Sequence, residues 1–153
     1  MNDLLIRVAV QADLPILKEF EQDIIATERS LNDCLKSEYI HYYDIGALIN
    51  SEKSCVMVAE NNGTIVGSGY ARIKESKVYL RHKLHAYLGL MYVVPSHRGQ
   101  GINQLVIQTL IKWAKTQGMQ DFYLEAYANN LPALKAYEKL GFRASLIEMK
   151  LFQ

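Results

Sequence analysis

The residues best suited to bind an anion lie where a strand-like run gives way to a helical one, from Val93 to Asn103. Gly99 and Gly101 let the backbone approach a ligand closely. The N–H groups at a helix start are unpaired and carry partial positive charge, and Arg98 adds a cation at the same point. The segment therefore predicts a phosphate or pyrophosphate site, although a glycine turn is by itself weak evidence.

Two familiar phosphate-binding motifs fit this turn poorly. A P-loop needs Gly-Lys-Ser/Thr, and no lysine follows Gly101. A dinucleotide fingerprint needs a third glycine where Gln104 stands, and it belongs to an early strand–helix–strand unit. A nucleotide-binding protein is therefore only the third functional interpretation.

A second group of residues surrounds a predicted helix over 132–140. Asn129 or Asn130 can cap this helix, and Ala133 and Tyr137 share one of its faces because they are four residues apart. The small alanine leaves room for a thin ligand beside the phenol. A tyrosine on a helix is by itself more often a half-buried core residue. The helix pattern therefore indicates a binding site only in combination with the glycine turn.

Together the two segments resemble the GNAT superfamily of N-acetyltransferases. The turn is similar to the family's cofactor motif Arg/Gln-x-x-Gly-x-Gly/Ala, and the helix to its Asn-x-x-Ala-x-x-x-Tyr, followed here by Lys-Leu-Gly-Phe. The resemblance is specific over 88–142 and looser before it. One departure is Asn103, where the family usually has Gly or Ala; its backbone N–H survives, so we expect altered affinity rather than lost binding.

The resemblance implies acetyl-CoA as the donor and an unidentified primary amine as the acceptor, with no metal. The pyrophosphate would sit on the glycine turn, and the pantetheine arm would run beside the end of the long central strand as an added strand would. The implied cofactor-binding residues are Met91, Tyr92, Val93, Arg98, Gly99, Gln100, Gly101, Ile102, Asn103, Gln104, Asn130, Ala133 and Tyr137. A bulge in that strand would aim an N–H at the thioester oxygen.

The resemblance also implies direct attack of the amine in a ternary complex, with Tyr137 protonating the departing thiolate. The base that takes the ammonium proton has two candidates, Glu125 and His85. Glu125 ends the strand before the second motif, where a water-facing carboxylate is an equal interpretation. His85 has the parity of Tyr87 and Met91 along the central strand and a suitable pKa for a base. Water is a third carrier of the proton.

The acceptor pocket in this fold is usually lined by the first helices. The predicted helix after Asp13 carries acidic residues from Glu19 to Glu28, and a cluster rich in tyrosine follows at 39–43. Carboxylates beside a pocket would favour a cationic amine. The alternative interpretation is that these residues form the solvent-exposed face of an amphipathic helix. The sequence does not choose among peptide, lysine, polyamine, amino-acid or antibiotic acceptors.

These residues require a scaffold of alternating strands and helices. Predicted strands are 4–10, 54–60, 64–73, 78–94, 121–126 and 144–152. One predicted helix begins after Asp13, a second runs from Ile102 to near Gly118, and a third covers 132–140, with helical spacing also over 35–43 and 45–49. The turn Asn61-Asn62-Gly63 predicts a hairpin, and Gly67 and Gly69 suggest a bulge or a close backbone approach. We expect an α/β fold of GNAT type, one domain over 1–153, with a single mixed, mostly antiparallel sheet of about six to seven strands and about four helices.

Composition narrows the class of protein further. The 153 residues carry a net charge of +1, which argues against a large nucleic-acid-binding surface. Cys34 and Cys55 frame no metal site, and the sequence shows neither a signal peptide nor a membrane span, so we expect a cytoplasmic protein. Many relatives of this fold pair through C-terminal strands, which suggests a homodimer. The second functional interpretation is a non-catalytic acyl-CoA-binding sensor.

Overall fold

The computed structural model describes residues 3–153 and contains one five-stranded sheet with strands in the order β1-β2-β3-β4-β5. The strands are β1 (Leu4–Val8), β2 (Ser54–Asn61), β3 (Thr64–Glu75), β4 (Leu84–Val93) and β5 (Phe122–Tyr123). The helices are α1 (Leu14–Arg29), α2 (Ile45–Asn50), α3 (Ile102–Thr116) and α4 (Leu131–Lys139), with short 3-10 turns at Gln11–Asp13 and Pro95–His97. The predicted α/β class and the mixed sheet are confirmed.

Most of the sheet is antiparallel. Strands β1 to β4 pair antiparallel in chain order, and only β4 and β5 pair in parallel. The predicted hairpin forms between β2 and β3, where Asn62 and Gly63 both adopt positive φ, 51° and 80°. Such a pair of left-handed residues matches the twist of the flanking strands.

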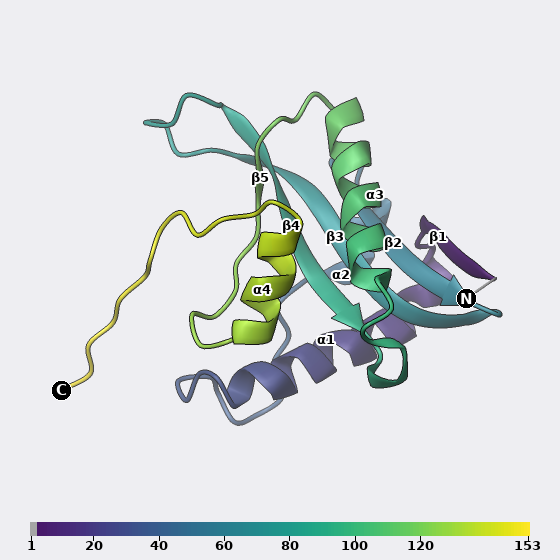
Figure 1. Cartoon of the computed structure of the whole chain (residues 1–153), viewed down its shortest axis with the longest axis horizontal. Helices are drawn as coiled ribbons and strands as arrows, with labels where there is room; N and C mark the ends of the chain where they lie inside the picture. The colour runs from purple at the N-terminus through teal and green to yellow at the C-terminus, as the bar shows by residue number, and fades with distance from the viewer. Residues whose placement is uncertain (1–2) are drawn as a thin grey trace.

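Helices cover both faces of the sheet. Alternate residues of β2 point to opposite sides: Met57 packs with Val106 of α3, whereas Val58 packs with Leu17 of α1. This two-residue period sets the layers, since successive side chains of a strand face opposite ways. Figure 1 shows α3 on one side of the sheet and α1 passing across the other.

One residue of β4 breaks the alternation. Leu90 has φ 54°, and the pairing with β3 shifts between Ser68 and Tyr70. Regular alternation would put Leu90 on the same side as Leu88, but Leu88 packs on the α3 side and Leu90 on the α1 side. The extra residue is a β-bulge, which bends its strand. It also corrects the predicted parity, because Tyr87 and Met91 now pack on opposite faces.

The two glycines of β3 face this bulge. A Cβ on Gly69 would lie 2.8 Å from the Met91 sulfur, and a Cβ on Gly67 would lie 3.1 Å from the Tyr92 carbonyl oxygen. The close approach that these glycines predicted is therefore confirmed, and the bulge itself lies in the partner strand β4.

Several predicted elements differ from the structure. The sheet has five strands over residues 3–153 rather than six or seven, because residues 144–152 join no strand, and residues 78–83 form a loop closed by the Ser76 N–H bonding to the Lys83 carbonyl. The strand predicted at 121–126 is reduced to β5. The helical spacing at 35–43 forms no helix. There the N–H groups of Tyr42 and Tyr43 instead bond to the buried Glu21 carboxylate, at 2.8 and 2.9 Å.

Candidate functional site

The predicted anion site is a turn of left-handed glycines before α3. Gly99 and Gly101 have φ 76° and 80°, and apart from the adjacent residues of the chain no atom lies within 4 Å of a Cβ built at either position. The first α3 hydrogen bond runs from the Leu105 N–H to the Gly101 carbonyl, so the three N–H groups before it point out of the helix start. This open backbone cradle is suited to an anion.

Side chains on either side fix this turn in place. Ile102, the first residue of α3, is 1% exposed and packs in the core. Arg98 donates from Nε to the Val93 carbonyl at 2.8 Å, and its guanidinium lies 5.5 Å from the Tyr92 ring centre. The turn is therefore attached to the end of β4, with the Asn103 side chain half-buried one residue into the helix.

Strands β4 and β5 separate beside the turn. They pair at only two positions, Ala86 with Phe122 and Tyr87 with Tyr123, whereas β4 continues to Val93. The bulge at Leu90 follows this pairing directly. The predicted bulge is thus present at the end of β4, and it lies in the part of β4 beyond its pairing with β5.

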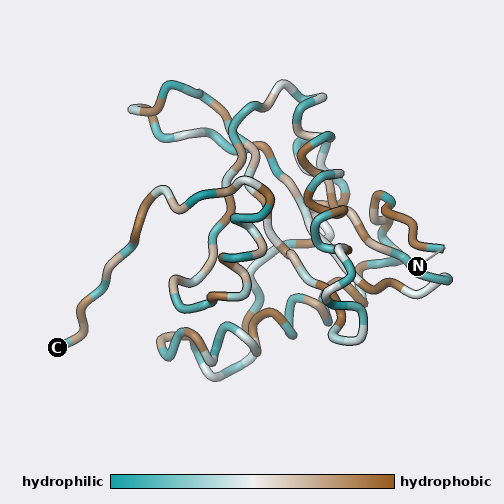
Figure 2. Tube along the Cα trace, in the orientation of Figure 1, coloured by the Kyte–Doolittle hydropathy of each residue, from teal (hydrophilic) through white to brown (hydrophobic). Residues whose placement is uncertain are grey.

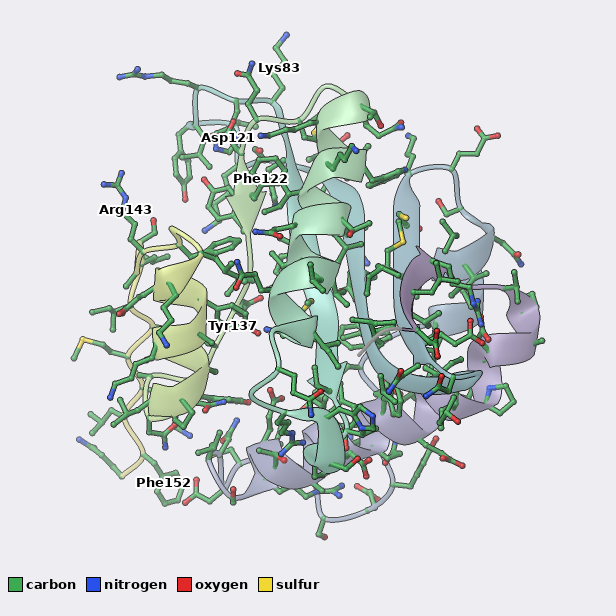
Figure 3. All side chains as sticks on the ribbon, turned by 45° about the vertical axis from the view of Figure 1, so that its right-hand side comes forward. Lys83, Asp121, Phe122, Tyr137, Arg143 and Phe152 are labelled. Carbon is green, nitrogen blue, oxygen red and sulfur yellow. The ribbon has the colours of Figure 1, made fainter. Side chains whose placement is uncertain are left out.

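Helix α4 carries Tyr137 to this region. Asn130 caps the helix by accepting from the Ala133 N–H at 3.4 Å, as one of the two predicted caps. The segment before it is tied to the end of α1, because Asn32 donates to the Tyr127 hydroxyl at 2.9 Å. Figure 3 shows the Tyr137 side chain on the side of α4 that faces the sheet.

A small pocket joins these elements. Its walls come from α1, the segment before α2, β4, the segment after β5, and α4: Ile24, Glu28, Tyr43, Tyr87, Leu88, Gly89, Leu90, Met91, Leu124, Glu125 and Tyr137. Two carboxylates therefore share one pocket with the predicted acid. Tyr87 donates its hydroxyl to Glu125 at 3.0 Å, which orients that carboxylate.

Burial and the neighbouring carboxylates shift several pKa values here. Burial, with a further contribution from the Glu125 charge, raises the pKa of Glu28 above its ordinary value. Burial and the Glu28 charge raise the pKa of Tyr137, so its hydroxyl keeps its proton at neutral pH. Burial raises the pKa of Tyr43 to about 12. The pocket is thus rich in neutral hydroxyl groups around two carboxylates.

The four acidic residues of α1 have four different surroundings. Glu19 is exposed to solvent, as expected for the polar face of an amphipathic helix. Glu21 is 2% exposed, and its carboxylate accepts hydrogen bonds from the backbone N–H groups of Tyr42 and Tyr43. Asp23 accepts from the Tyr92 hydroxyl at 2.9 Å, and Glu28 enters the pocket. Neither interpretation of the acidic face therefore holds for the whole helix.

Sequence reasoning included Glu28 and Tyr43 in a broader candidate lining of the acceptor pocket, and the structure places these two in the pocket; it did not name Tyr87 as a pocket residue. Ile24 and Glu28 are four apart on α1 and both line the pocket. That spacing was the available signal for Glu28. Nothing in the local pattern of Tyr87 distinguishes a pocket tyrosine from a core one.

His85 lies elsewhere on β4. Its Nδ1 is 2.9 Å from the Ser76 hydroxyl, which also lies 2.7 Å from His82 Nδ1, and its ring packs on Tyr123. Burial and the nearby His82 lower the pKa of His85. The pocket walls do not include it. The structure brings Glu125 and Tyr137 together and leaves His85 in a separate cluster with His82.

Residues 3–153 contain no cluster of three metal-ligating side chains. Among the helices that the structure describes, none combines the length and the apolar character needed to cross a membrane.

Solved structures with the same fold include acetyltransferases. A mutant of the BH1408 protein from Bacillus halodurans superposes with a TM-score of 0.86, covering 97% of this chain and 99% of that one at 19% identity. A predicted acetyltransferase with acetyl-CoA from Clostridium acetobutylicum gives 0.71 at 19% identity, covering 97% and 96%. The aminoglycoside N-acetyltransferase AAC(6')-Iy in complex with CoA gives 0.75 at 16% identity, covering 97% and 98%. These likenesses establish the fold.

Sequence relatives lead to the same family. N-alpha-acetyltransferase 30 of Schizosaccharomyces pombe is 29% identical over 69% of this chain, and human N-acetyltransferase 8B is 30% identical over 59%. The chain spans 66% and 39% of the lengths of those two proteins. The model of the acetyltransferase (GNAT) family matches residues 18–142, which include the glycine turn, the pocket and Tyr137. The chain therefore belongs to the acetyltransferase (GNAT) family.

Proposed function

We propose that this protein is an N-acetyltransferase that moves the acetyl group of acetyl-CoA to a cationic primary amine. The observation that carries the proposal is the position of one pocket. It lies where β4 and β5 part, with Tyr137 on one wall and the carboxylates of Glu28 and Glu125 on others. The glycine turn lies at the end of the same strand β4.

The residues present fit acetyl-CoA. The N–H groups of Ile102, Asn103 and Gln104 would hold the pyrophosphate, supported by the open backbone of residues 99–101 and by Arg98. The backbone of residues 91–93 would pair with the pantetheine arm. Asn130 caps α4, and the face of this helix that carries Ala133 and Tyr137 would lie beside that path. When bound, acetyl-CoA supplies the acetyl group as a thioester, which the amine attacks directly in a ternary complex.

Tyr137 would protonate the leaving sulfur. Its raised pKa means that the phenol is present at neutral pH with its proton, as an acid must be. A thiol has an ordinary pKa near 8.5, below that of a phenol near 10, so the sulfur holds the proton less strongly than the phenol does. Protonation of a free thiolate by the phenol is therefore uphill, so the transfer would need hydrogen-bond contact between the two atoms while the carbon–sulfur bond breaks.

Glu125 and Glu28 would receive the acceptor. Glu125 is held by the Tyr87 hydroxyl and is the candidate base that accepts the ammonium proton. Glu28 would add a second negative charge on the α1 wall, so the pocket attracts a protonated amine before it is deprotonated. The lining tyrosines supply apolar surface and hydroxyl groups for the carbon chain of such an amine.

The test is a titration followed by a turnover screen. Calorimetry of the purified protein with acetyl-CoA should show one site per chain, and NAD and ATP serve as matched competitors. A panel of polyamines, aminoglycosides, lysine peptides and free amino acids is then assayed for CoA release with a thiol reagent. We expect turnover with cationic amines. Binding without turnover on any amine would favour the acyl-CoA sensor, and binding of NAD or ATP in preference would favour the nucleotide interpretation.

A further inference from the structure

The loop between β3 and β4, residues 76–83, carries a contiguous apolar tip. Val78, Tyr79 and Leu80 follow one another, and their exposed fractions are 100%, 75% and 38%. Figure 1 shows this loop projecting beyond the end of the sheet at the upper left, and Figure 2 shows a brown stretch near its tip between teal flanks. Single exposed apolar residues are common, whereas a contiguous exposed set marks a surface that contacts a partner or a membrane.

Hydrogen bonds at its base brace this loop against two strands. The Ser76 N–H donates to the Lys83 carbonyl at 2.8 Å, which closes the loop. The Ser76 hydroxyl lies 2.7 Å from His82 Nδ1, and His82 Nε2 lies 2.9 Å from the Tyr123 hydroxyl of β5. The loop is therefore already ordered in the free protein, so contact through its tip costs little conformational entropy.

Basic side chains surround the apolar tip. Residues 74–83 hold four of them and a single carboxylate, that of Glu75: Lys74, Lys77, Arg81 and Lys83. The whole chain carries a net charge of +1, so the rest of the chain is net negative and positive charge is concentrated at this loop. The Asp121 carboxylate lies 3.9 Å from His82 Nε2, at the base of the loop rather than at its tip. Figure 3 shows Lys83 at the outer edge of the molecule.

We propose that this loop docks the protein on a membrane surface that contains anionic lipids. The three apolar side chains enter the boundary between headgroups and acyl chains, and the basic side chains lie among the negatively charged headgroups. Tyr79 suits that boundary because a tyrosine ring is apolar and its hydroxyl is polar. A fluid surface closes around a convex tip, whereas an acidic protein would need a cavity of matching shape. Contact of this kind requires no membrane-spanning segment.

Docking through this loop leaves the proposed acetyl-CoA site open. The loop precedes β4, whereas the glycine turn follows the opposite end of this ten-residue strand. At about 3.3 Å per residue, the two ends of β4 are roughly 30 Å apart. The inference depends neither on the acceptor nor on the proposed reaction, because it rests on the loop alone.

Co-sedimentation of the purified protein with vesicles tests the proposal. Vesicles of phosphatidylcholine and phosphatidylserine, at about two to one, are compared with vesicles of pure phosphatidylcholine. We expect about 100-fold tighter binding to the mixed vesicles, because each basic residue near an anionic surface contributes about 1 kcal/mol. Added salt should release the protein by screening these charges. Equal binding to both vesicles overturns the proposal, and no binding to the mixed vesicles overturns it in favour of an acidic protein partner.

A charge variant locates the contact at the loop. Lys77→Gln with Arg81→Gln should weaken binding to the mixed vesicles by about 30-fold, since two basic residues are lost at about 1 kcal/mol each. Lys135→Gln with Lys139→Gln is the matched control, because it changes the net charge equally at two exposed positions of α4. The control should bind within about threefold of wild type. Equal losses in the two variants would mean that diffuse charge binds the vesicles, which contradicts docking through the loop.

An apolar variant tests insertion of the tip. Val78→Ser with Tyr79→Ser keeps every charge and should weaken binding to the mixed vesicles by about tenfold, because membrane affinity scales with buried apolar area. Both side chains are largely exposed, so unfolding by denaturant should match that of wild type. A folded variant that binds as tightly as wild type would show that the apolar tip stays outside the membrane, and the proposal would then be wrong.

Discussion

The turn before α3 and the pocket between α1, β4 and α4 both serve one proposed reaction, but they are built differently. The turn uses backbone: two left-handed glycines and the free N–H groups of a helix start, all within six residues from Gly99 to Gln104. The pocket uses side chains from α1, the segment before α2, β4, the segment after β5, and α4. A feature made by neighbouring residues tolerates side-chain changes, whereas one made by distant segments depends on each of them.

Within the pocket, the residue proposed as the acid should show the largest effect. Replacing Tyr137 with Phe removes the proton donor and leaves the packing, so kcat should fall by about 10²- to 10⁴-fold. Acetyl-CoA affinity, measured by calorimetry, should stay within about twofold because the ring is retained. Tyr79→Phe, in the exposed loop after β3, is the matched control and should leave kcat unchanged. A Tyr137→Phe enzyme as fast as wild type would remove the acid from the mechanism.

A change in the turn itself should weaken acetyl-CoA next most strongly. Gly101→Ala places a side chain at φ 80°, a conformation that costs about 1–2 kcal/mol outside glycine. The turn should relax and the affinity should fall about tenfold, or about 1.4 kcal/mol. Gly118→Ala is the matched control, since Gly118 has φ 87° at the far end of α3. Denaturant unfolding should show similar destabilisation in both variants, and equal losses of acetyl-CoA affinity would argue against the turn as the site.

On the pocket side, Glu28→Gln should raise KM for a cationic amine by roughly fivefold, equivalent to about 1 kcal/mol. The wild-type KM should rise as the pH falls through the raised pKa of Glu28, because the carboxylate becomes neutral. The variant should lack that component of the pH profile. Steady-state kinetics across pH measures both, and an unchanged profile would remove Glu28 from acceptor binding.

The same substitution, Glu28→Gln, should stabilise the folded protein at pH 7 although it weakens binding of the amine. The folded-state pKa of Glu28 is raised above its ordinary value of 4.5, mainly by burial. The stability of the native state is therefore greatest below pH 4.5 with respect to this group and declines as the pH rises through the raised value. Glu28→Gln should raise Tm at pH 7 by on the order of 1–2 °C, and the gain should vanish near pH 4.5. Calorimetric melting tests this, with Glu19→Gln on the exposed side of α1 as a control of no expected effect.

Asn103→Ala should have the smallest effect. The backbone N–H at this position remains, so acetyl-CoA affinity should change by no more than about threefold, or roughly 0.6 kcal/mol. Calorimetric titration decides. A tenfold change in either direction would mean that the amide side chain contacts the ligand, and the difference between a backbone-built and a side-chain-built region would then not hold at this residue.

Sequence information was sufficient for the features that depend on short-range pattern. The hairpin at Asn62-Gly63, the glycine turn, and the cap at Asn130 each depend on a few adjacent residues whose backbone preferences are strong. The close approach at Gly69 was also predicted, because a glycine within a strand has few other reasons to be there. Family membership followed from two such patterns in order.

Features that depend on tertiary competition were not predictable in this way. Tyr42 and Tyr43 have helical spacing, but the Glu21 carboxylate from another element takes their N–H groups. The predicted alternation of side chains along β4 was wrong, because Leu90, with its positive φ, reverses the face to which every later side chain of the strand points. The candidate bases had equal standing in sequence, and only the pocket walls separate Glu125 from His85. Residues 144–152 have a strand pattern without a strand partner in their own chain.

Leu90 connects the packing of the core on the α1 side to the backbone geometry of β4 at the pocket. Its backbone occupies a conformation that a leucine alone would not keep, and it is held there because its side chain is packed among Leu17, Phe20 and Val58. The bulge in β4 is thus stabilised by packing against the α1 layer. Anything that loosens that layer, such as gentle heating or a smaller side chain at position 17, should let the strand straighten and disturb catalysis while most of the molecule remains folded.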